Sequence, residues 1–291
     1  MILAVDIGGT KLAAGLVDPD DGRILARAAT PTPRSDDAEV VFGALVGLFD
    51  ALGPGRVAGA EVCGVGSGGP MSAGGETLTP VHIPAWREFP LRRRLAEATG
   101  LAVFVDNDAK AVALAEGWIG AAAGVQAYIG MVVSTGIGGG IVLDGRLLDG
   151  RAGNAGHIGH VVVEPGGRRC FCGGRGCLEG EASGRAIEAA TGRPPAEAGP
   201  AVIARTGALV GRAVASAANL LDLGLAVVAG SVALGFGAPF FAAAQAEVDD
   251  LARLEFSRST RIRPAGLGGD APLVGAAAVA LYRLGRLPCY R

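Results

Sequence analysis

One pattern of strand, glycine turn and strand occurs twice in this chain of 291 residues, and it constrains the fold more than any other feature. The first copy, DIGGTKLAAGLVD, occupies residues 6–18, and the second, VVSTGIGGGIVLD, occupies residues 132–144. The apolar runs on both sides of each glycine turn predict buried strands joined as hairpins. Because segments of helical spacing follow each copy, the repeat predicts two α/β halves with a cleft between them.

Outside the repeat, short apolar runs alternate with segments of helical spacing. The runs predict further strands at 60–66, 101–105, 225–230 and 261–265, and the spacing predicts helices at 36–52, 90–99, 107–118, 183–191, 201–221, 237–255 and 271–285. A polar, proline-rich connection, TGRPPAEAGP, occupies residues 191–200. We expect the last helix to pack on the N-terminal half. This gives a smaller domain of residues 1–106 plus 272–291 and a larger domain of residues 107–271.

The composition excludes several classes of protein. A formal charge of −2 gives no electrostatic footprint for nucleic acid. No apolar stretch reaches about 18 uncharged residues, so we expect no membrane span. The N-terminus begins directly with the strand-like ILAVDI and has no basic region or cleavage site, which argues against a secretory signal. We therefore expect a cytoplasmic protein, and in that compartment clustered cysteines bind metal more often than they form disulfides.

Both glycine turns have the composition of a phosphate-binding loop. DIGGTK is not a Walker A loop, because that motif needs GxxxxGK[ST] and a helix, whereas a strand follows here. Backbone N–H groups in a tight glycine turn can still surround phosphate oxygens, and Asp6 at the strand end is placed to hold Mg²⁺ through water. The alternative is an ordinary hairpin. The candidate ATP-binding residues are Gly8, Gly9, Thr10 and Lys11 in the first turn, Thr135 and Gly136 in the second, and Gly230 and Ser231 after the strand at 225–230.

The segment VDNDAKAVALAEGW at 105–118 ends a strand and begins a helix. Asp108 lies at the helix N-terminus, where a carboxylate could orient and deprotonate a sugar hydroxyl for phosphoryl transfer. Asn107 beside it could form hydrogen bonds with sugar hydroxyls. The alternative is that Asp106, Asn107 and Asp108 only cap the helix, and the segment taken alone favours capping. Lys110 lies one turn from Asp106, and we expect an ion pair between them.

Seven segments, in order along nearly the whole chain, resemble the ROK family (repressor, open reading frame, kinase) within the actin/hexokinase-like fold. They are DIGGTK at 6–11, GVGSGGP at 64–70, NDAKAVALAE at 107–116, STGIGGGIV at 134–142, AGHIGH at 155–160, CxCGGxGCLE at 170–179 and AGS at 229–231. The resemblance implies duplicated, ribonuclease H-like α/β domains. It also implies either an ATP- and Mg²⁺-dependent sugar kinase or a sugar-responsive repressor. The matching motifs imply that Asp108 is the general base. They also imply that the phosphates contact Gly9, Thr10, Thr135 and Gly136. The implied sugar-binding residues are Asn107, Asp108, His160 and Glu179.

Three of the five cysteines and two of the three histidines lie between residues 155 and 184. Cys170, Cys172 and Cys177 on a short glycine-rich loop, together with His160, make a Cys₃His set, which is typical of a structural zinc site. We expect zinc to order this loop, which carries His160 and Glu179, rather than to act as a Lewis acid. The alternative is that the cysteines are reduced bystanders.

Family glucokinases usually read AGEIGH, whereas this chain has His157 at the glutamate position. An imidazole offers one donor and one acceptor, where a carboxylate accepts from two hydroxyls. The AGHIGH form resembles bacterial N-acetylmannosamine kinases, whose sugar carries an axial acetamido group at C2. His157 is therefore a candidate sugar-binding residue, and it slightly favours N-acetylmannosamine. The alternatives are that His157 only packs against the zinc loop, or that it reads glucose through water.

The leading hypothesis is an ATP-dependent kinase that phosphorylates the 6-hydroxyl of an aldohexose or N-acylhexosamine, with glucokinase as the first alternative. A transcriptional regulator is disfavoured, because only five residues precede Asp6 and leave no room for a helix-turn-helix domain. A sugar-binding protein without catalysis is disfavoured by Asp108 and the two phosphate turns. The expected partners are the small-molecule sugar and ATP, with Mg²⁺ and structural Zn²⁺ as cofactors. Because family members are commonly dimers or tetramers, we expect a homo-oligomer.

Overall fold

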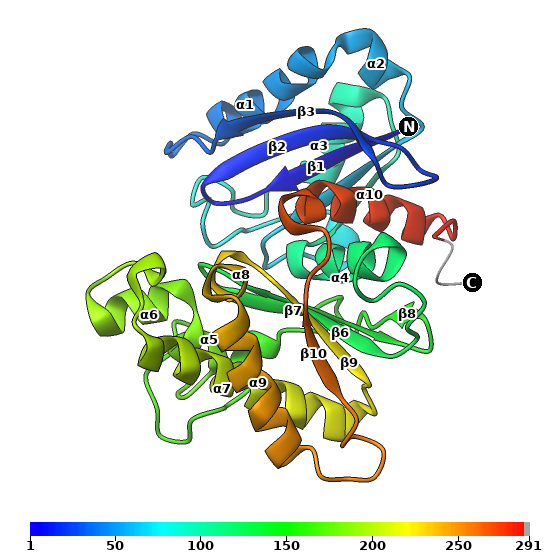
Figure 1. Cartoon of the computed structure of the whole chain (residues 1–291). Coiled ribbons are helices and arrows are strands. Elements are labelled where there is room, and N and C mark those ends of the chain that lie inside the picture. Colours follow the sequence, from blue (N-terminus) through cyan, green and yellow to red (C-terminus); the bar gives the residue numbers. More distant parts are fainter. Residues whose placement is uncertain (288–291) are drawn as a thin grey trace. The chain divides into compact units, whose positions relative to one another are not determined.

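The computed structural model describes residues 1–287, and the chain divides into two compact units. Unit 1 contains Met1–Ile119, Asp149–Gly153 and the chain from Leu267 onward, and unit 2 contains Gly120–Leu148 and Asn154–Gly266. Each unit is built on one five-stranded sheet (Figure 1). The last residues of the expected smaller domain, 288–291, lie outside the described residues.

The sheet of unit 1 begins with an antiparallel meander, which contains the first predicted hairpin. In order across the sheet, its strands are β3 (Ile24–Pro31), β2 (Lys11–Val17), β1 (Ile2–Ile7), β4 (Val62–Ser67) and β5 (Val103–Asn107). The strands β1 and β2 pair antiparallel across the DIGGTK turn, whereas β1, β4 and β5 run parallel. Because parallel strands end at the same edge of a sheet, the residues that end β1, β4 and β5 come together.

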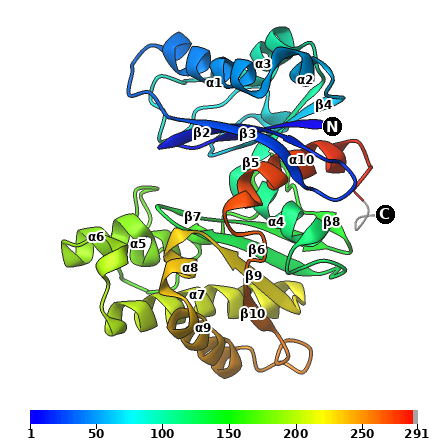
Figure 2. The same ribbon diagram turned by 45° about the horizontal axis from the view of Figure 1, so that its top comes forward.

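Helices cover both faces of this sheet. They are α1 (Ala38–Leu52), α2 (Pro54–Ala58), α3 (Leu91–Thr99), α4 (Asp108–Ile119) and α10 (Ala271–Arg283), with short 3₁₀ turns at Ala73–Gly75 and Gly268–Asp270. The helices α1 and α3 lie on one face, and α4 and α10 lie on the other (Figures 1 and 2). Helix α1 begins where the Asp37 carboxylate accepts a hydrogen bond from the Glu39 N–H at 2.8 Å.

Gly64 in β4 allows α10 to approach the sheet to backbone contact. A Cβ atom at Gly64 would lie only 1.9 Å from the carbonyl oxygen of Ala276. On the helix, small side chains meet the strand, and Ala276 and Ala280 are completely buried. This contact holds the last described helix in unit 1, so the prediction that it packs on the N-terminal half is confirmed.

The sheet of unit 2 repeats the arrangement of the first. In order across the sheet, its strands are β10 (Arg261–Pro264), β9 (Leu225–Ala229), β6 (Tyr128–Val133), β7 (Ile137–Leu143) and β8 (Arg146–Leu147). The strands β6 and β7 form the second glycine hairpin, and β6, β9 and β10 run parallel. Both sheets therefore combine a glycine hairpin with parallel strands beside its first strand, as a duplicated fold requires.

The helices of unit 2 include one long apolar helix. They are α5 (Leu178–Ala182), α6 (Gly184–Thr191), α7 (Pro200–Leu221), α8 (Ser231–Phe236) and α9 (Ala238–Leu251), with 3₁₀ turns at Ile158–His160 and Pro195–Glu197. By length and composition alone α7 could cross a membrane, but 56% of its most apolar window is buried inside the fold. Its Arg212 also pairs with Glu247 of α9 at 2.6 Å. A buried core helix of a folded domain meets the same criterion of length and composition, so α7 is only weak evidence for a membrane span.

The two units differ from the expected domains at residues 107–119, 149–153 and 267–271. All three segments belong to unit 1. For residues 107–119 the physical reason is that α4 packs along α10 and against β4 and β5. Helical spacing reveals that a helix is present, but it does not reveal which sheet the helix will cover.

We expect Gly64→Ala to destabilise unit 1, because the added methyl group would collide with the backbone of α10. Overpacking of this kind typically costs about 1–3 kcal/mol. Urea denaturation should therefore show a lower midpoint for the variant than for the wild type. The matched control is Gly43→Ala in the exposed face of α1, where no atom lies within 4 Å of the added Cβ and the helix gains about 0.5–1 kcal/mol. An unchanged midpoint for Gly64→Ala would show that the close contact is absent.

Candidate functional site

The candidate residues of unit 1 gather at the carboxyl ends of its parallel strands. Asp6 of β1 pairs in register with Gly66 of β4, and Gly66 pairs with Asp106 of β5. One residue further along, Ser67 pairs with Asn107. The sequence therefore places Asp6, Asn107 and the start of α4 at one edge of one sheet, where α/β proteins bind their ligands.

The first glycine turn has the geometry of a hairpin and an exposed outer surface. The Gly8 N–H donates to the Lys11 carbonyl oxygen at 3.0 Å, and Thr32 Oγ1 donates to the Gly8 carbonyl oxygen at 2.7 Å. Gly9, Thr10 and Lys11 are exposed. The hairpin expected as the alternative is thus present. The phosphate-binding role of these exposed residues stays a prediction.

Asp108 is the first residue of α4, and its side chain is exposed. The Ala109 N–H donates to Asp108 Oδ1 at 2.8 Å and to Asn107 Oδ1 at 3.0 Å, so the capping interpretation is confirmed for both residues. The other carboxylate oxygen, Oδ2, lies near Gly68, 4.0 Å from where a Cβ atom of that residue would be. Capping fixes the orientation of the Asp108 carboxylate, which is also what a general base requires.

Asp6 lies close enough to Asp108 for the two carboxylates to affect each other. Burial and, to a smaller extent, the negative charge of Asp108 raise the pKa of Asp6, Lys11 opposes the rise, and the resulting pKa is about 7. Two carboxylates at one strand edge disfavour each other's ionised form, and a divalent cation would compensate for this. The residues present therefore fit the predicted association of Asp6 with Mg²⁺.

The second glycine turn, Ser134–Gly136, is held by hydrogen bonds from two other parts of unit 2. The Gly184 N–H at the start of α6 donates to the Ser134 carbonyl oxygen at 2.8 Å. The hydroxyl groups of Ser134 and Ser231 lie 2.9 Å apart. These contacts bring together Thr135, Gly136, Gly230 and Ser231, which are the candidate phosphate-binding residues of this unit.

Glu179 connects the cysteine loop to this turn. It lies in α5, two residues after Cys177, and its Oε2 accepts a hydrogen bond from the Ile137 N–H at 2.6 Å. Gly136 has no room for a side chain, because a Cβ atom there would lie 2.9 Å from Glu179 Oε2. One oxygen of the predicted sugar-binding carboxylate is therefore bonded to the backbone at the start of β7.

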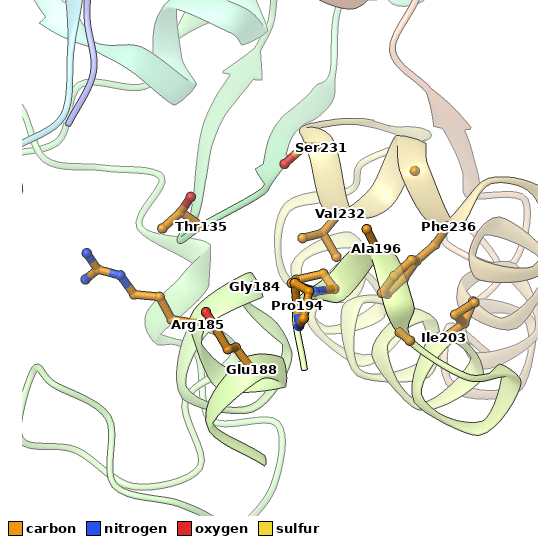
Figure 3. A pocket seen from close by; sticks show the side chains of 13 residues that line it. Thr135, Gly184, Arg185, Glu188, Pro194, Ala196, Ile203, Ser231, Val232 and Phe236 are labelled. Carbon is orange, nitrogen blue, oxygen red and sulfur yellow. The ribbon is translucent and has the colours of Figure 1, made fainter. Parts of the chain in front are cut away.

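A cavity of about 470 Å³ opens beside the second turn, entirely within unit 2 (Figure 3). Its polar lining consists of Thr135, Arg185, Glu188 and Ser231, and its apolar lining includes Pro194, Pro195, Ala198, Ile203, Val232 and Phe236. In Figure 3 the Arg185 guanidinium points away from the apolar wall that Ile203 and Phe236 form. An apolar chamber with hydroxyl groups on a glycine turn suits a planar ring joined to a phosphate chain.

Sequence reasoning missed most of this lining. It identified Thr135 and Ser231 but treated residues 191–200 as a connection, whereas Pro194 and Pro195 line the cavity. Arg185 and Glu188 lie one turn apart in α6, which the sequence presented only as a helix. The paired prolines were the available signal, since they give a short segment a rigid apolar surface, here at the start of the 3₁₀ turn Pro195–Glu197.

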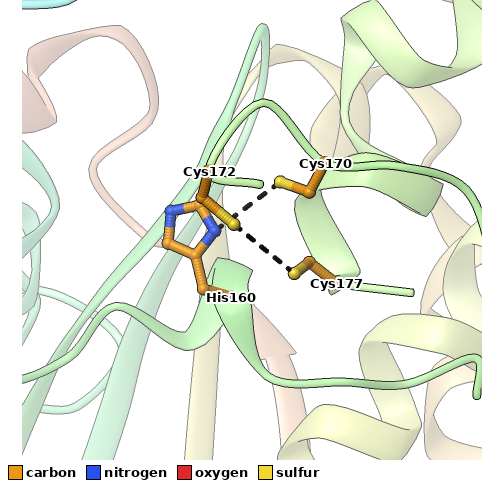
Figure 4. A group of neighbouring side chains, drawn as sticks. All are labelled: His160, Cys170, Cys172 and Cys177. Atoms are coloured by element: carbon orange, nitrogen blue, oxygen red, sulfur yellow. Dashed lines mark hydrogen bonds between the residues drawn. The ribbon is translucent and has the colours of Figure 1, made fainter. Parts of the chain in front are cut away.

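The predicted Cys₃His set comes together in the structure (Figure 4). The ligand atoms of His160, Cys170, Cys172 and Cys177 all lie within 4.8 Å of one another. Cys170 Sγ lies 3.8 Å from His160 Nδ1, and Cys172 Sγ lies 3.8 Å from Cys177 Sγ. Zn–S bonds of about 2.3 Å in a tetrahedron place sulfur atoms about 3.8 Å apart, so the spacing fits zinc.

The electrostatics of the set also suit a cation. Burial raises the pKa of Cys170, and burial together with the neighbouring thiols raises that of Cys177 to about 12. A hydrogen bond from the Gly174 backbone lowers the pKa of Cys172. A bound cation would favour the thiolate forms that burial disfavours.

His157 lies beside this set rather than within it. Its ring is stacked near that of His160, with centroids 6.0 Å apart, and its side chain is exposed. His157 directly precedes the 3₁₀ turn Ile158–His160, and His160 is its last residue. The structure thus places His157 next to a predicted sugar-binding residue, which is the position that a contact with the sugar would require.

Comparison with known proteins gives consistent matches. The sequence model described as ROK family matches residues 2–283. The N-acetylmannosamine kinase of Citrobacter koseri is 44% identical over 189 residues, which are 65% of this chain and 63% of that protein. The glucokinase of Thermotoga maritima is 40% identical over 187 residues, which are 64% of this chain and 58% of that protein. The chain therefore spans less than two thirds of the length of these two curated relatives. A solved ROK family glucokinase from Streptomyces griseus, in complex with glucose and AMPPNP, has a TM-score of 0.81 and 32% identity, and the match covers 95% of this chain and 97% of that one.

The raised pKa of Asp6 predicts a pH-dependent effect of Asp6→Asn on stability. A carboxyl group whose pKa is higher in the folded than in the unfolded state stabilises the fold at low pH, and this contribution is lost as pH rises through about 7. In metal-free buffer, the Tm of Asp6→Asn relative to wild type should therefore rise between pH 5 and pH 8. Asp36→Asn, at an exposed position, serves as the control and should show no such trend. A constant Tm difference for Asp6→Asn would contradict the raised pKa.

Proposed function

This chain belongs to the ROK family, and we propose that it is an ATP-dependent sugar kinase that phosphorylates the 6-hydroxyl of a hexose or N-acylhexosamine. The observation that carries the proposal is the cavity of unit 2, whose Thr135 and Ser231 hydroxyls lie at a glycine turn beside an apolar chamber. The chamber suits the adenine ring, and the turn suits the phosphates. The curated relatives are sugar kinases by name, and the nucleotide analogue in the S. griseus structure agrees with an ATP site.

The phosphate chain would be bound by backbone N–H groups and hydroxyls rather than by a lysine-bearing helix. In unit 2 these come from Thr135, Gly136, Gly230 and Ser231. In unit 1 the exposed turn of Gly8, Gly9, Thr10 and Lys11 is a separate candidate for phosphate contacts. Asp6 would hold Mg²⁺ through water, and the ion would neutralise charge on the phosphates. Small residues in both turns let the backbone reach the phosphate oxygens directly.

Asp108 would act as the general base. Its carboxylate is exposed, is oriented by the Ala109 N–H and lies at the strand edge that also carries Asp6. In phosphoryl transfer such a group orients the attacking hydroxyl and accepts its proton. Asn107, the neighbouring residue, would hydrogen-bond the sugar and so hold the 6-hydroxyl against Asp108.

The remaining sugar contacts would come from His157, His160 and Glu179. With Nδ1 of His160 facing Cys170 Sγ at 3.8 Å, its other ring nitrogen would donate to a sugar hydroxyl. His157, exposed beside it, would read the substituent at C2. A single imidazole in place of a carboxylate suits an acetamido group, so N-acetylmannosamine is the favoured substrate and glucose is the second candidate.

Zinc would bind the Cys₃His set and act structurally. The four ligand atoms fill a tetrahedral shell and leave no open position for a substrate, which is the make-up of a structural site. Its effect would reach the sugar through His160 and through Glu179, two residues after Cys177. The cytoplasm is the compartment we propose, because thiols remain reduced there and able to bind metal.

The activity is tested by measuring ADP release with Mg-ATP and a panel of glucose, mannose, fructose, N-acetylglucosamine, N-acetylmannosamine and allose. We expect the highest kcat/KM for N-acetylmannosamine. His157→Glu should lower the ratio of kcat/KM for N-acetylmannosamine to that for glucose by about tenfold, because a second acceptor replaces the imidazole donor. Preference of the wild type for glucose would make this chain a glucokinase and exclude the specificity role of His157.

The variant that tests the chemical step is Asp108→Asn. It keeps the size of the side chain but removes the base, so turnover should fall by about a hundredfold or more. Sugar binding, measured by calorimetry without ATP, should remain within about threefold of the wild type. Turnover at the wild-type rate would refute the role of Asp108 while leaving the kinase activity established.

Removal of zinc should weaken sugar binding. We expect metal analysis to find one zinc per chain, and expect a chelator to increase the proteolytic sensitivity of residues 160–180. The Kd for the sugar should rise by about tenfold, because His160 and Glu179 lose their support. Cys172→Ser should reproduce the effect, whereas Cys63→Ser, at a buried cysteine outside the set, should keep its zinc. A zinc-free protein with unchanged sugar affinity would exclude the proposed role of the metal.

A further inference from the structure

A closed ring of four charges lies beneath the strand edge that carries Asp108. Lys110 in α4 is the more buried of its two cations, with only 2% of its side chain exposed. Its Nζ donates to Asp149 Oδ1 at 2.8 Å and lies 3.4 Å from Asp106 Oδ1, which confirms the expected ion pair with Asp106. Arg283 of α10 closes the ring, since it bonds Asp106 Oδ2 at 2.7 Å and Asp149 Oδ2 at 2.8 Å. Two cations and two carboxylates alternate, and their charges balance.

The ring joins three segments that are distant in the sequence. Asp106 ends β5, Lys110 lies in the first turns of α4, and Arg283 ends α10. The fourth member, Asp149, begins a short segment, Asp149–Gly153, that belongs to unit 1 although its neighbours on both sides in the sequence belong to unit 2. Lys110 Nζ also donates to the Gly153 carbonyl oxygen at 3.1 Å, so one side chain holds both ends of this segment.

The ring is connected directly to the proposed reaction residues. The Asn107 N–H donates to Asp106 Oδ1 at 2.8 Å, and Asn107 in turn accepts from the Ala109 N–H. Asp106 and Lys110 therefore hold the backbone immediately before and after Asp108. Burial opposes ionisation of Asp149, but hydrogen bonds from Arg283 and Lys110 bring the pKa of this carboxyl group below its usual range, so Asp149 stays ionised at neutral pH.

Stability alone does not require such a ring. Lys110 and Asp106 are buried, and buried ion pairs contribute little net stability compared with well-packed apolar side chains, because removing charges from water is costly. Arg283 and Asp149 are partly exposed, and water screens the pair that they form. What these ion pairs provide is geometry, since each charge must face a partner at a fixed distance. In reactions that depend on orientation, a displacement of about 1 Å can cost about a hundredfold in rate.

We propose that Lys110, together with Asp106, Asp149 and Arg283, positions Asp108 for phosphoryl transfer. These are positioning residues, because they act through the backbone of residues 106–110 and not on the substrate. The inference rests on the proposed kinase activity of this chain. It predicts an effect on kcat rather than on sugar affinity, since Asp108 acts on the reacting hydroxyl.

Two variants and one control test the ring. Lys110→Met leaves one uncompensated carboxylate, and should lower both Tm and kcat. The double variant Lys110→Met/Asp149→Asn restores the charge balance, so it should regain most of the lost Tm while kcat remains about tenfold or more below wild type. Sugar KM and the calorimetric Kd should change by less than about threefold. The control, Arg27→Met, removes an exposed 2.8 Å ion pair with Asp270 in the same unit and should keep the wild-type kcat.

Each outcome decides between positioning and a structural role. If the double variant regains kcat together with Tm, the ring serves stability only and the proposal is overturned. A rise in sugar KM at unchanged kcat overturns it as well. If Lys110→Met does not fold, the double variant alone carries the comparison. If the wild type phosphorylates no sugar, the proposed function fails first and the ring has no transfer step to support, which separates the two failures.

Discussion

Contact between backbones, made where a glycine leaves no side chain, is the constraint on which the candidate site depends. A Cβ atom at Gly230, whose φ is 101°, would lie 2.3 Å from the Val133 carbonyl oxygen, so glycine is needed to bring Ser231 beside the second turn. Gly159 approaches Ile137 in the same way and thereby sets the position of His160. Larger residues at these positions would separate the turn, the strand ends and the metal ligands from one another.

Much of this architecture follows from local features of the sequence. Apolar runs and helical spacing predicted the strands and most of the helices, because burial of one face imposes a period on the sequence. Two glycine turns between apolar runs predicted the two hairpins, and the order of polar residues after β5 predicted the cap of α4. The Cys₃His set was predictable as well, because its cysteines lie within eight residues of one another on one loop.

Features that depend on contacts between distant segments could not be predicted. Lys110 was expected to pair with Asp106 one turn away, but its shorter contact is with Asp149, 39 residues further along the chain. Arg283 meets Asp106 across 177 residues. Periodicity carries no information about such distances, and the same limit explains why the compact units differ from the expected domains at residues 107–119. Pro194 and Pro195 escaped notice because a cavity wall needs no regular secondary structure.

The hydrogen bond from the Ile137 N–H to Glu179 has a consequence for how this protein could change over time. Glu179 follows the last cysteine of the metal loop by two residues, and its carboxylate fills the space that Gly136 leaves empty. A shift of the loop would thus move the carboxylate off the turn, and a side chain at position 136 would push the carboxylate back toward the loop. Amino-acid substitutions in residues 170–179 and in residues 134–137 therefore depend on each other. In proteins that descend from this sequence, we expect the two segments to change together.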